Sequence, residues 1–253
     1  IYKDSPAEKA GLKENDILYK VEGKEVTGKD LSKVVSKVKG EKGTTVELTV
    51  LRGEDAKEVT VTATRDTVQA QTIEYKMMDD KIGYIRVSEF DTVTYDQYKE
   101  ALDDLEKQGM TGLVVDLRNN PGGSLSTVCD MLDLMLPKGL IVYTEDKDGK
   151  KTKMKSDEEH QFTKPLAVLV NGNSASASEI FAGAIQDYGK GTIIGTQTYG
   201  KGIVQTVKPL TDGSAIKFTI AKYFTPKGQD IHGKGVTPDM VVEYDTEDRK
   251  SVV

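Results

Sequence analysis

Two short runs of apolar residues stand out in the middle of the chain. Residues 112–117 read Gly-Leu-Val-Val-Asp-Leu, and residues 166–170 read Leu-Ala-Val-Leu-Val. Both have the length and composition of strands that are buried on both faces. Each run is followed by a loop and then by apolar residues at helical spacing, from residue 125 and from residue 180. Buried strands that alternate with helices predict a parallel sheet in an α/β fold.

The segments around these runs show other patterns. Alternating apolar residues predict β-hairpins at 73–87 and, around Asp212-Gly213, at 203–221. Residues 94–97, Thr-Tyr-Asp-Gln, fit a capping box, and the apolar residues behind them predict a helix. We therefore expect a core that mixes α and β elements, with a parallel sheet, flanking helices and β-hairpins.

The first 66 residues form a separate pattern. They predict a short helix near residue 6, a strand at 16–21, a helix at 30–38 and two alternating strands. Residues 66–72 are polar and lack periodicity, as a linker does. We therefore expect two domains, residues 1–66 and residues 67–253.

Charge and composition limit the classes of function that the sequence allows. The 253 residues carry 41 acidic and 35 basic side chains, and the basic ones form no stripe, so nucleic acid is not an expected partner. No apolar run reaches the roughly 18 residues needed to span a bilayer, although a membrane anchor upstream of Ile1 is compatible with the sequence. The single cysteine, Cys129, excludes an intrachain disulfide, and its apolar surroundings indicate a core thiol.

A serine-rich segment follows the second apolar run. Residues 171–179 read Asn-Gly-Asn-Ser-Ala-Ser-Ala-Ser-Glu and lie where a strand is predicted to turn into a helix. Unpaired N–H groups and the helix dipole at a helix start would stabilise an oxyanion, so a serine here is a candidate nucleophile. Residues 176–179 also fit a capping box, which favours a purely structural role for one of these serines.

A serine nucleophile needs a base, and the sequence offers two kinds. His160 lies in a charged stretch and His232 in a glycine-punctuated one, and nothing near either singles it out. Lys201 lies among apolar residues and between Gly200 and Gly202, which permit close backbone approach. Burial disfavours an ammonium ion, and a neutral amine can accept a proton from serine. Lys201 is therefore the favoured base, and His232 is the alternative.

Four segments of the chain form a recognisable set of motifs. They are Val-Asp-Leu-Arg-Asn-Asn-Pro-Gly-Gly at 115–123, the serine segment, Tyr-Gly-Lys-Gly-Ile-Val-Gln at 199–205 and Ile-His-Gly-Lys-Gly-Val-Thr-Pro-Asp at 231–239. In this order they closely resemble the carboxyl-terminal processing proteases, also called tail-specific proteases. The resemblance covers nearly the whole chain. It implies a serine endopeptidase with a serine–lysine dyad and no cofactor or metal, which acts on protein or peptide substrates in a bacterial extracytoplasmic setting.

The resemblance also implies roles for individual residues. Within the serine segment it selects Ser176 as the nucleophile, rather than Ser174 or Ser178. The remaining implied site residues are the base Lys201, its hydrogen-bonding partner Gln205, and the oxyanion-hole donors Ala177 and Gly122, with Gly123 as the alternative to Gly122.

The N-terminal domain resembles a PDZ domain of the type found in these proteases. The similarity rests on Ser-Pro-Ala-Glu-Lys-Ala-Gly-Leu at 5–12 and Asn-Asp-Ile-Leu at 15–18. A PDZ domain holds an extended peptide as an added strand and binds its terminal carboxylate on backbone amides. The first strand and the carboxylate-binding loop of such a domain usually precede the position of Ile1, so we expect a partial PDZ domain and name no carboxylate-binding residue. A purely structural role for this domain is the alternative.

Other motifs suggest different chemistry but fail in detail. Residues 195–201 match the start of a phosphate-binding P-loop, but Gly202 replaces the required Ser or Thr and strands replace the required helix. Residues 146–149 begin like a calcium loop without its remaining ligands, so a turn is expected. Residues 157–160 contain acidic side chains and one histidine, which is too few good ligands for a transition metal.

Two hypotheses about function therefore stand. The first is an endopeptidase whose PDZ domain engages unfolded or carboxyl-terminal segments. The second is a peptide-binding module whose protease domain is silent or is held silent by the PDZ domain. Asp116 and Arg118 lie at a strand end, where such a pair is more often a structural ion pair than a catalytic one. Assembly into an oligomer is compatible with both hypotheses.

Overall fold

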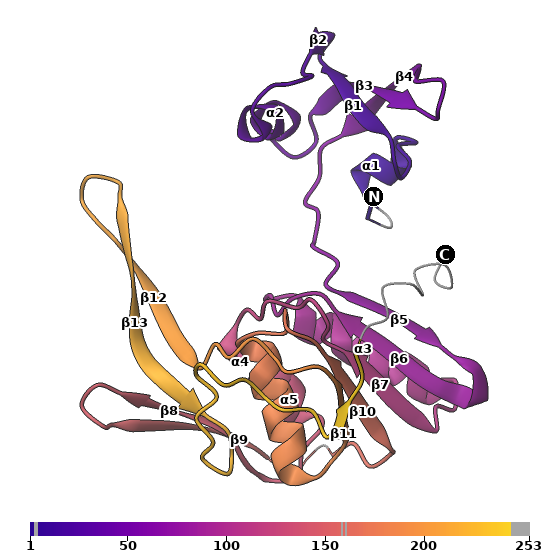
Figure 1. The fold of residues 1–253 in the computed structure, drawn as a ribbon. Helices are drawn as coiled ribbons and strands as arrows, with labels where there is room; N and C mark the ends of the chain where they lie inside the picture. The colour runs from indigo at the N-terminus through magenta and orange to yellow at the C-terminus, as the bar shows by residue number, and fades with distance from the viewer. Residues whose placement is uncertain (3–4, 158, 160, 244–253) are drawn as a thin grey trace. The chain divides into compact units, whose positions relative to one another are not determined.

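The computed structural model describes residues 1–2, 5–157, 159 and 161–243, and the chain divides into two compact units (Figure 1). The units are Ile1–Ala70 and Gln71–Val253. The division falls inside the polar stretch that the sequence analysis assigns to a linker.

The N-terminal unit is a four-stranded antiparallel sheet of order β2-β1-β3-β4 with two helices. Its strands are β1 (Ile17–Val21), β2 (Lys24–Glu25), β3 (Thr45–Arg52) and β4 (Lys57–Thr64). Helices α1 (Pro6–Lys9) and α2 (Leu31–Val38) begin after Ser5 and Asp30, whose side chains accept hydrogen bonds from N–H groups of the first turn. A small apolar core forms from Val21, Val26, Val34, Val46, Leu48 and Ala63.

The larger unit is built on a six-stranded sheet of order β14-β11-β10-β7-β6-β5. Strands β6, β7, β10, β11 and β14 pair in parallel, and β5 pairs antiparallel with β6 at one edge. The bounds are β5 (Ile73–Met77), β6 (Ile82–Val87), β7 (Gly112–Asp116), β10 (Leu166–Val170), β11 (Thr192–Gly195) and β14 (Met240–Val241), with a 3-10 turn, η1 (Asp79–Lys81), between β5 and β6. The parallel sheet and its helices confirm the predicted fold class.

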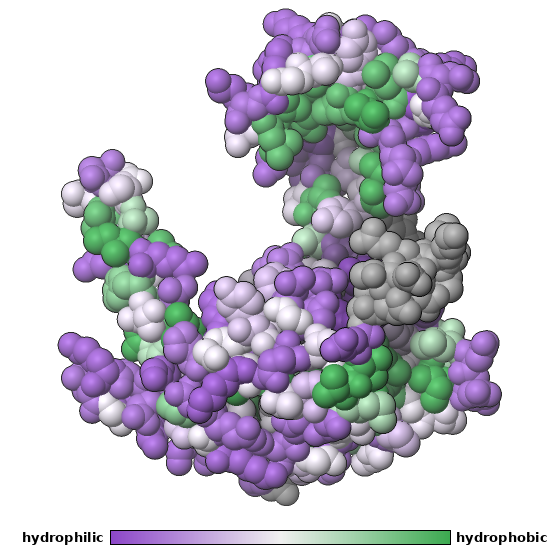
Figure 2. All heavy atoms as spheres, viewed as in Figure 1, coloured by the Kyte–Doolittle hydropathy of each residue, from purple (hydrophilic) through white to green (hydrophobic). Residues whose placement is uncertain are grey.

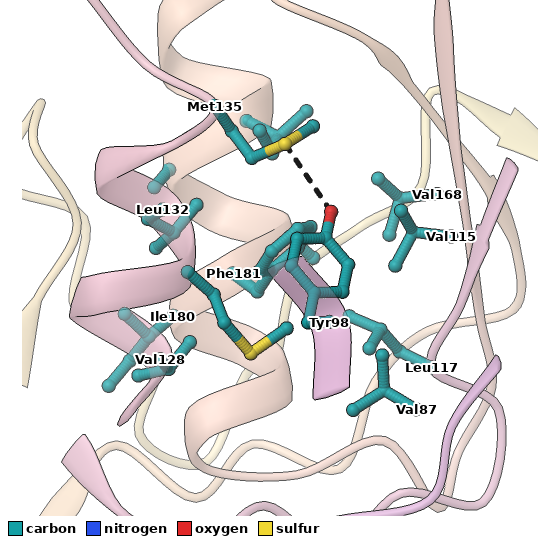
Figure 3. Packing of buried hydrophobic residues seen from close by; sticks show 14 of the residues in the cluster. Val87, Tyr98, Val115, Leu117, Val128, Leu132, Met135, Val168, Ile180 and Phe181 are labelled. Atoms are coloured by element: carbon teal, nitrogen blue, oxygen red, sulfur yellow. Dashed lines mark hydrogen bonds between the residues drawn. The ribbon is translucent and has the colours of Figure 1, made fainter. Parts of the chain in front are cut away.

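The main core lies where three helices pack with the strands of this sheet (Figure 3). The helices are α3 (Thr94–Lys107), α4 (Leu125–Asp133) and α5 (Ala177–Tyr188). Tyr98 of α3 is completely buried at its centre, and its hydroxyl donates a hydrogen bond of 3.3 Å to the sulfur of Met135. Cys129 of α4 is also buried in this core, as the sequence predicted.

A second, antiparallel sheet of order β12-β13-β8-β9 belongs to the same unit. It contains β8 (Gly139–Asp146), β9 (Lys151–Ser156), β12 (Ile203–Pro209) and β13 (Ala215–Phe224). Figure 1 shows that the β12–β13 hairpin projects from the body of the unit, and Figure 2 shows apolar residues exposed along it. The hairpin predicted around Asp212-Gly213 is therefore confirmed.

The capping box predicted at residues 94–97 is wrong. Val93 is the N-cap residue of α3, and it makes no side-chain capping hydrogen bond. The Thr94 and Thr72 hydroxyls instead lie at a hydrogen-bond distance of 2.8 Å, and the Gln97 amide oxygen accepts a hydrogen bond of 3.0 Å from the N–H of Thr72. The two side chains that would have formed the box instead make hydrogen bonds with the segment before β5.

Candidate active site

Ser176 lies at the junction of a buried strand and a helix. β10 ends at Val170, and after a short loop Ser176 is the N-cap residue of α5. Its φ is 55° and its ψ is −112°, a backbone conformation that residues other than glycine rarely adopt. Ser176 is half-buried and borders a pocket of about 300 Å³. Such strain at a pocket is often found at functional sites.

Lys201 and Gln205 border the same pocket. Lys201 is half-buried just before β12, and Gln205 lies on β12. The remaining residues that line the pocket are Gly123, Leu125, Ala177, Ile180, Ile203, Val204, Lys217 and Tyr223. The structure thus brings together Ser176, Lys201 and Gln205, which the family resemblance assigned to one dyad and its support.

Glu179 connects the segments that carry Ser176 and Lys201. Its side chain is completely buried, and one carboxylate oxygen accepts the N–H of Ser176 (2.9 Å) and the N–H of Lys201 (2.8 Å). The other oxygen accepts the Thr198 hydroxyl and the N–H of Gly200, both at 2.6 Å. The predicted capping box of residues 176–179 is present. The sequence predicts Glu179 as part of that box, but nothing in the sequence indicates its contacts with residues 198–201.

Tyr223 of β13 contacts the same two residues from another side. Its hydroxyl donates toward the carbonyl oxygens of Ser176 (3.0 Å) and Lys201 (2.5 Å). Tyr223 is 1% exposed, and burial together with the nearby carboxylate of Glu179 raises the pKa of its phenol far above the usual value. No local pattern in the sequence indicates this residue, because only the pairing of distant strands places it at the site.

The backbone amides expected to form the oxyanion hole lie beside Ser176. Ala177 is the first residue of α5. Gly122 approaches the nucleophile segment so closely that a Cβ at this position would lie 2.7 Å from the Cβ of Ser176. The N–H of Gly122 donates to the side-chain oxygen of Asn120 (2.8 Å), whereas Gly123 borders the pocket. Both glycines are therefore close enough to be considered for the second donor.

Asn120 joins the loop after β7 to the serine segment. It is completely buried, and its carbonyl oxygen accepts the N–H of Ala175 and the hydroxyl of Ser178, both at 3.0 Å. Its side-chain amide donates to the carbonyl of Val87 (2.8 Å). Ser178 is therefore buried and bonded to the backbone, which leaves Ser176 as the serine of this pair that borders the pocket.

The alternative base and the strand-end ion pair lie outside the pocket lining. His232 is exposed, and its backbone N–H donates to the Asp230 carboxylate. The Asp116 carboxylate accepts hydrogen bonds from the Arg118 guanidinium (2.6 Å) and the Tyr84 hydroxyl (2.7 Å). Burial raises the pKa of Asp116, but these hydrogen bonds outweigh it and hold that pKa below its usual value. Asp116 is buried and Arg118 is exposed, so the pair has the geometry of a structural ion pair at the edge of the core.

The motifs that suggest phosphate or metal binding do not form such sites in the structure. Gly202 is followed by β12 rather than by a helix, so the P-loop hypothesis fails. The Asp146 carboxylate accepts the N–H groups of Asp148 and Lys150, which closes a turn between β8 and β9. Residues 158 and 160 of the acidic segment lie outside the described part of the chain. Within that part, no group of three or more His, Cys, Asp or Glu side chains could hold a metal ion, and no helix is long and apolar enough to cross a membrane.

Comparison with known proteins gives two family matches. The model of Peptidase family S41 matches residues 81–242, and a PDZ domain model matches residues 1–52. A probable CtpA-like serine protease of Staphylococcus haemolyticus is 42% identical over 94% of this chain and 48% of its own length. Carboxy-terminal processing protease CtpA of Bacillus subtilis is 41% identical over 95% of this chain and 52% of its own length. The chain thus spans about half the length of these curated relatives.

A solved structure shows the same similarity. The photosystem II D1 C-terminal processing protease matches with a TM-score of 0.64 and 34% sequence identity, over 95% of this chain and 66% of that one. The sequence and fold similarities therefore agree on one family of proteases.

Proposed function

The chain belongs to peptidase family S41, and from this membership we propose that it is a serine endopeptidase in which Ser176 is the nucleophile and Lys201 the general base. One observation carries the proposal: Ser176, Lys201 and Gln205 border a single pocket although they come from α5 and from the start of β12. A serine and a lysine amine together can perform acyl transfer without an imidazole.

In the proposed acylation, the neutral Lys201 amine takes the proton of the Ser176 hydroxyl while Oγ attacks the carbonyl carbon of the substrate. The carbonyl π-bond opens, and its oxygen becomes an oxyanion near the N–H of Ala177 and an N–H of Gly122 or Gly123. Because the Gly122 amide already has Asn120 as a partner, Gly123 is the donor that the resting geometry favours. When the intermediate collapses, the C–N bond breaks and the Lys201 ammonium gives its proton to the leaving amine.

In the proposed deacylation, the Lys201 amine takes a proton from a water molecule, whose oxygen attacks the acyl-enzyme carbonyl. The ester bond then breaks, and the proton returns from Lys201 to Ser176 Oγ. Gln205 lines the same pocket, and its proposed role is to orient the Lys201 amine by a hydrogen bond.

Substrate capture by the PDZ unit is part of the proposal. This unit contains a pocket of about 680 Å³ whose lining includes the apolar residues Tyr2, Val38, Val46, Leu48, Ala63 and Val68. Such a pocket fits the apolar end of an extended peptide. Peptides with an apolar C-terminal residue and a free carboxylate are expected to compete with substrate at least about tenfold better than their amidated forms. If the free and the amidated peptides compete equally well, the PDZ unit does not recognise the carboxylate and that part of the proposal is rejected.

The dyad is tested with Ser176→Ala and Lys201→Ala, assayed on β-casein and with a fluorophosphonate probe. We expect each variant to lose at least about a thousandfold in turnover while it stays folded, because residues that act as a unit fail together. Ser214→Ala and Lys208→Ala are matched controls in the exposed part of the β12–β13 hairpin and should retain activity. Hydrolysis retained by Lys201→Ala would reject the dyad and direct attention to His232.

The occupied Gly122 amide favours a second candidate function, a peptide-binding module whose protease domain is silent. A protein that neither nicks β-casein nor reacts with the probe, but binds peptides, would support this alternative. An extracytoplasmic location is a further proposal, which rests on the family resemblance and is tested by cell fractionation.

A further inference from the structure

Ser176 and Lys201 are each held through both of their backbone polar groups. The Glu179 carboxylate accepts the N–H groups of both residues. On the other side, the Tyr223 hydroxyl lies within hydrogen-bond distance of the carbonyl oxygens of both. Two buried side chains therefore connect the two segments independently of the side chains proposed to react.

These connections matter because neither segment holds itself in place. Ser176 has a positive φ, which is unfavourable for a residue with a Cβ. Lys201 is flanked by Gly200, with a φ of 89°, and by Gly202, so the local chain has unusual conformational freedom. Contacts from elsewhere must fix the backbone of each residue before its side chain can be aimed.

The Tyr223 contact is more important for Lys201 than for Ser176. The carbonyl oxygen of Ser176 also accepts the N–H groups of Glu179 and Ile180, so it keeps partners without the phenol. The phenol lies closer to the carbonyl of Lys201, at 2.5 Å, and the backbone N–H of Tyr223 donates to the carbonyl of Gly202 (3.1 Å). Tyr223 thus binds two successive carbonyls of the Gly-Lys-Gly segment.

We propose that Tyr223 is a positioning residue, whose hydroxyl fixes the backbone of Lys201 relative to that of Ser176 and so sets the approach of the amine to the nucleophile. This inference rests on the proposed function, because it concerns the geometry of the same dyad. The raised pKa of the buried phenol keeps its proton in place, so Tyr223 acts as a hydrogen-bond donor and not as a base.

The test is Tyr223→Phe, which removes the hydroxyl and keeps the ring. Tyr98→Phe is the matched control, since Tyr98 is equally buried in the same unit, donates to Met135 (Figure 3) and does not line the pocket. Turnover is measured on a fluorogenic peptide that carries a cleavage site mapped in β-casein. We expect kcat of Tyr223→Phe to fall about 10- to 100-fold with KM within about twofold, because misplaced reacting groups lose rate rather than binding. The rate of fluorophosphonate labelling should fall with kcat.

Tyr98→Phe should keep the wild-type kcat and KM. The inference is overturned if kcat of Tyr223→Phe stays within about twofold of wild type, or if both variants lose kcat equally, as general destabilisation would cause. An inactive Ser176→Ala together with a fully active Tyr223→Phe would remove the positioning role and leave the proposed function standing. Hydrolysis retained by Ser176→Ala would overturn both.

Discussion

Replacement of Glu179 by glutamine is a small chemical change, but it should strongly destabilise the larger unit. The carboxylate accepts four hydrogen bonds in a completely buried position. A glutamine amide offers one oxygen, which can keep two of the donors. Its NH2 group then faces the other two. If the oxygen stays with Ser176 and Lys201, the Thr198 hydroxyl can rotate to accept from the NH2 group, but the N–H of Gly200 loses its acceptor.

The magnitude follows from these losses. A buried donor left without an acceptor costs about 1–3 kcal/mol, and the remaining hydrogen bonds lose their charge assistance. We therefore expect the free energy of unfolding to fall by about 2–4 kcal/mol. For a unit of this size the fall corresponds to a Tm lower by about 5–15 °C in calorimetry. Because the Gly200–Lys201 backbone loses an anchor, kcat should also fall by at least about tenfold.

Glu74→Gln is the matched control for this substitution. Glu74 is exposed, and its contact with Arg86 is a surface ion pair of 3.4 Å. Such pairs contribute about 0–1 kcal/mol, so the control should melt within about 3 °C of wild type. A Glu179→Gln protein that melts as close to wild type as the control would refute the reasoning, because four buried contacts would then contribute no more than one exposed pair.

Two further substitutions and one thiol-reactivity measurement test other parts of the structure. Burial raises the pKa of Asp116, but its hydrogen bonds with Arg118 and Tyr84 hold that pKa below its usual value. The contribution of Asp116 to the free energy of unfolding is therefore complete above about pH 4 and is lost as the pH falls below that value. The calorimetric stability advantage of wild type over Asp116→Asn should therefore shrink as pH falls from about 5 to 3, whereas a constant difference would contradict this origin. Burial and a neighbouring aspartate raise the pKa of Cys129 to about 12, so native protein at pH 8 should react with Ellman's reagent at least about a hundredfold more slowly than unfolded protein. Gly122→Ala should lower kcat by at least about a hundredfold, because the added Cβ would lie 2.7 Å from the Cβ of Ser176 at a φ of 102°; an active variant would show that the loop can move aside.

Most of the fold could be predicted from local patterns. The buried strands at 112–117 and 166–170 became β7 and β10, because runs of branched apolar residues need cover on both faces. The β12–β13 hairpin followed from alternation around a turn signal. The capping box at 94–97 failed because its side chains bond to Thr72, which only the fold brings near. Local sequence patterns predict the helices and strands, whereas the hydrogen-bond partners of their polar side chains depend on tertiary contacts.

The candidate site divides in the same way. The motifs placed Ser176 at a helix start and Lys201 between two glycines, which local sequence can reveal. The roles of Asn120 and Tyr223 depend on distant segments that meet, so no spacing in the sequence indicates them. Glu179 is intermediate, because its capping function is local and its bonds to residues 198–201 are not.

The capping box and the proposed nucleophile are compatible, although the sequence presented them as competing interpretations. The Glu179 carboxylate accepts a hydrogen bond from the backbone N–H of Ser176, and Ser176 itself still borders the pocket. A positive φ at a residue with a Cβ costs about 1–3 kcal/mol and persists only where surrounding contacts determine it. The two hydrogen bonds that Glu179 makes to Ser176 and Lys201 are charge-assisted, and each bond of this kind contributes about 1.5–3 kcal/mol, which is comparable with that strain. A helix cap thus also fixes a strained backbone and joins it to the segment that carries the proposed base.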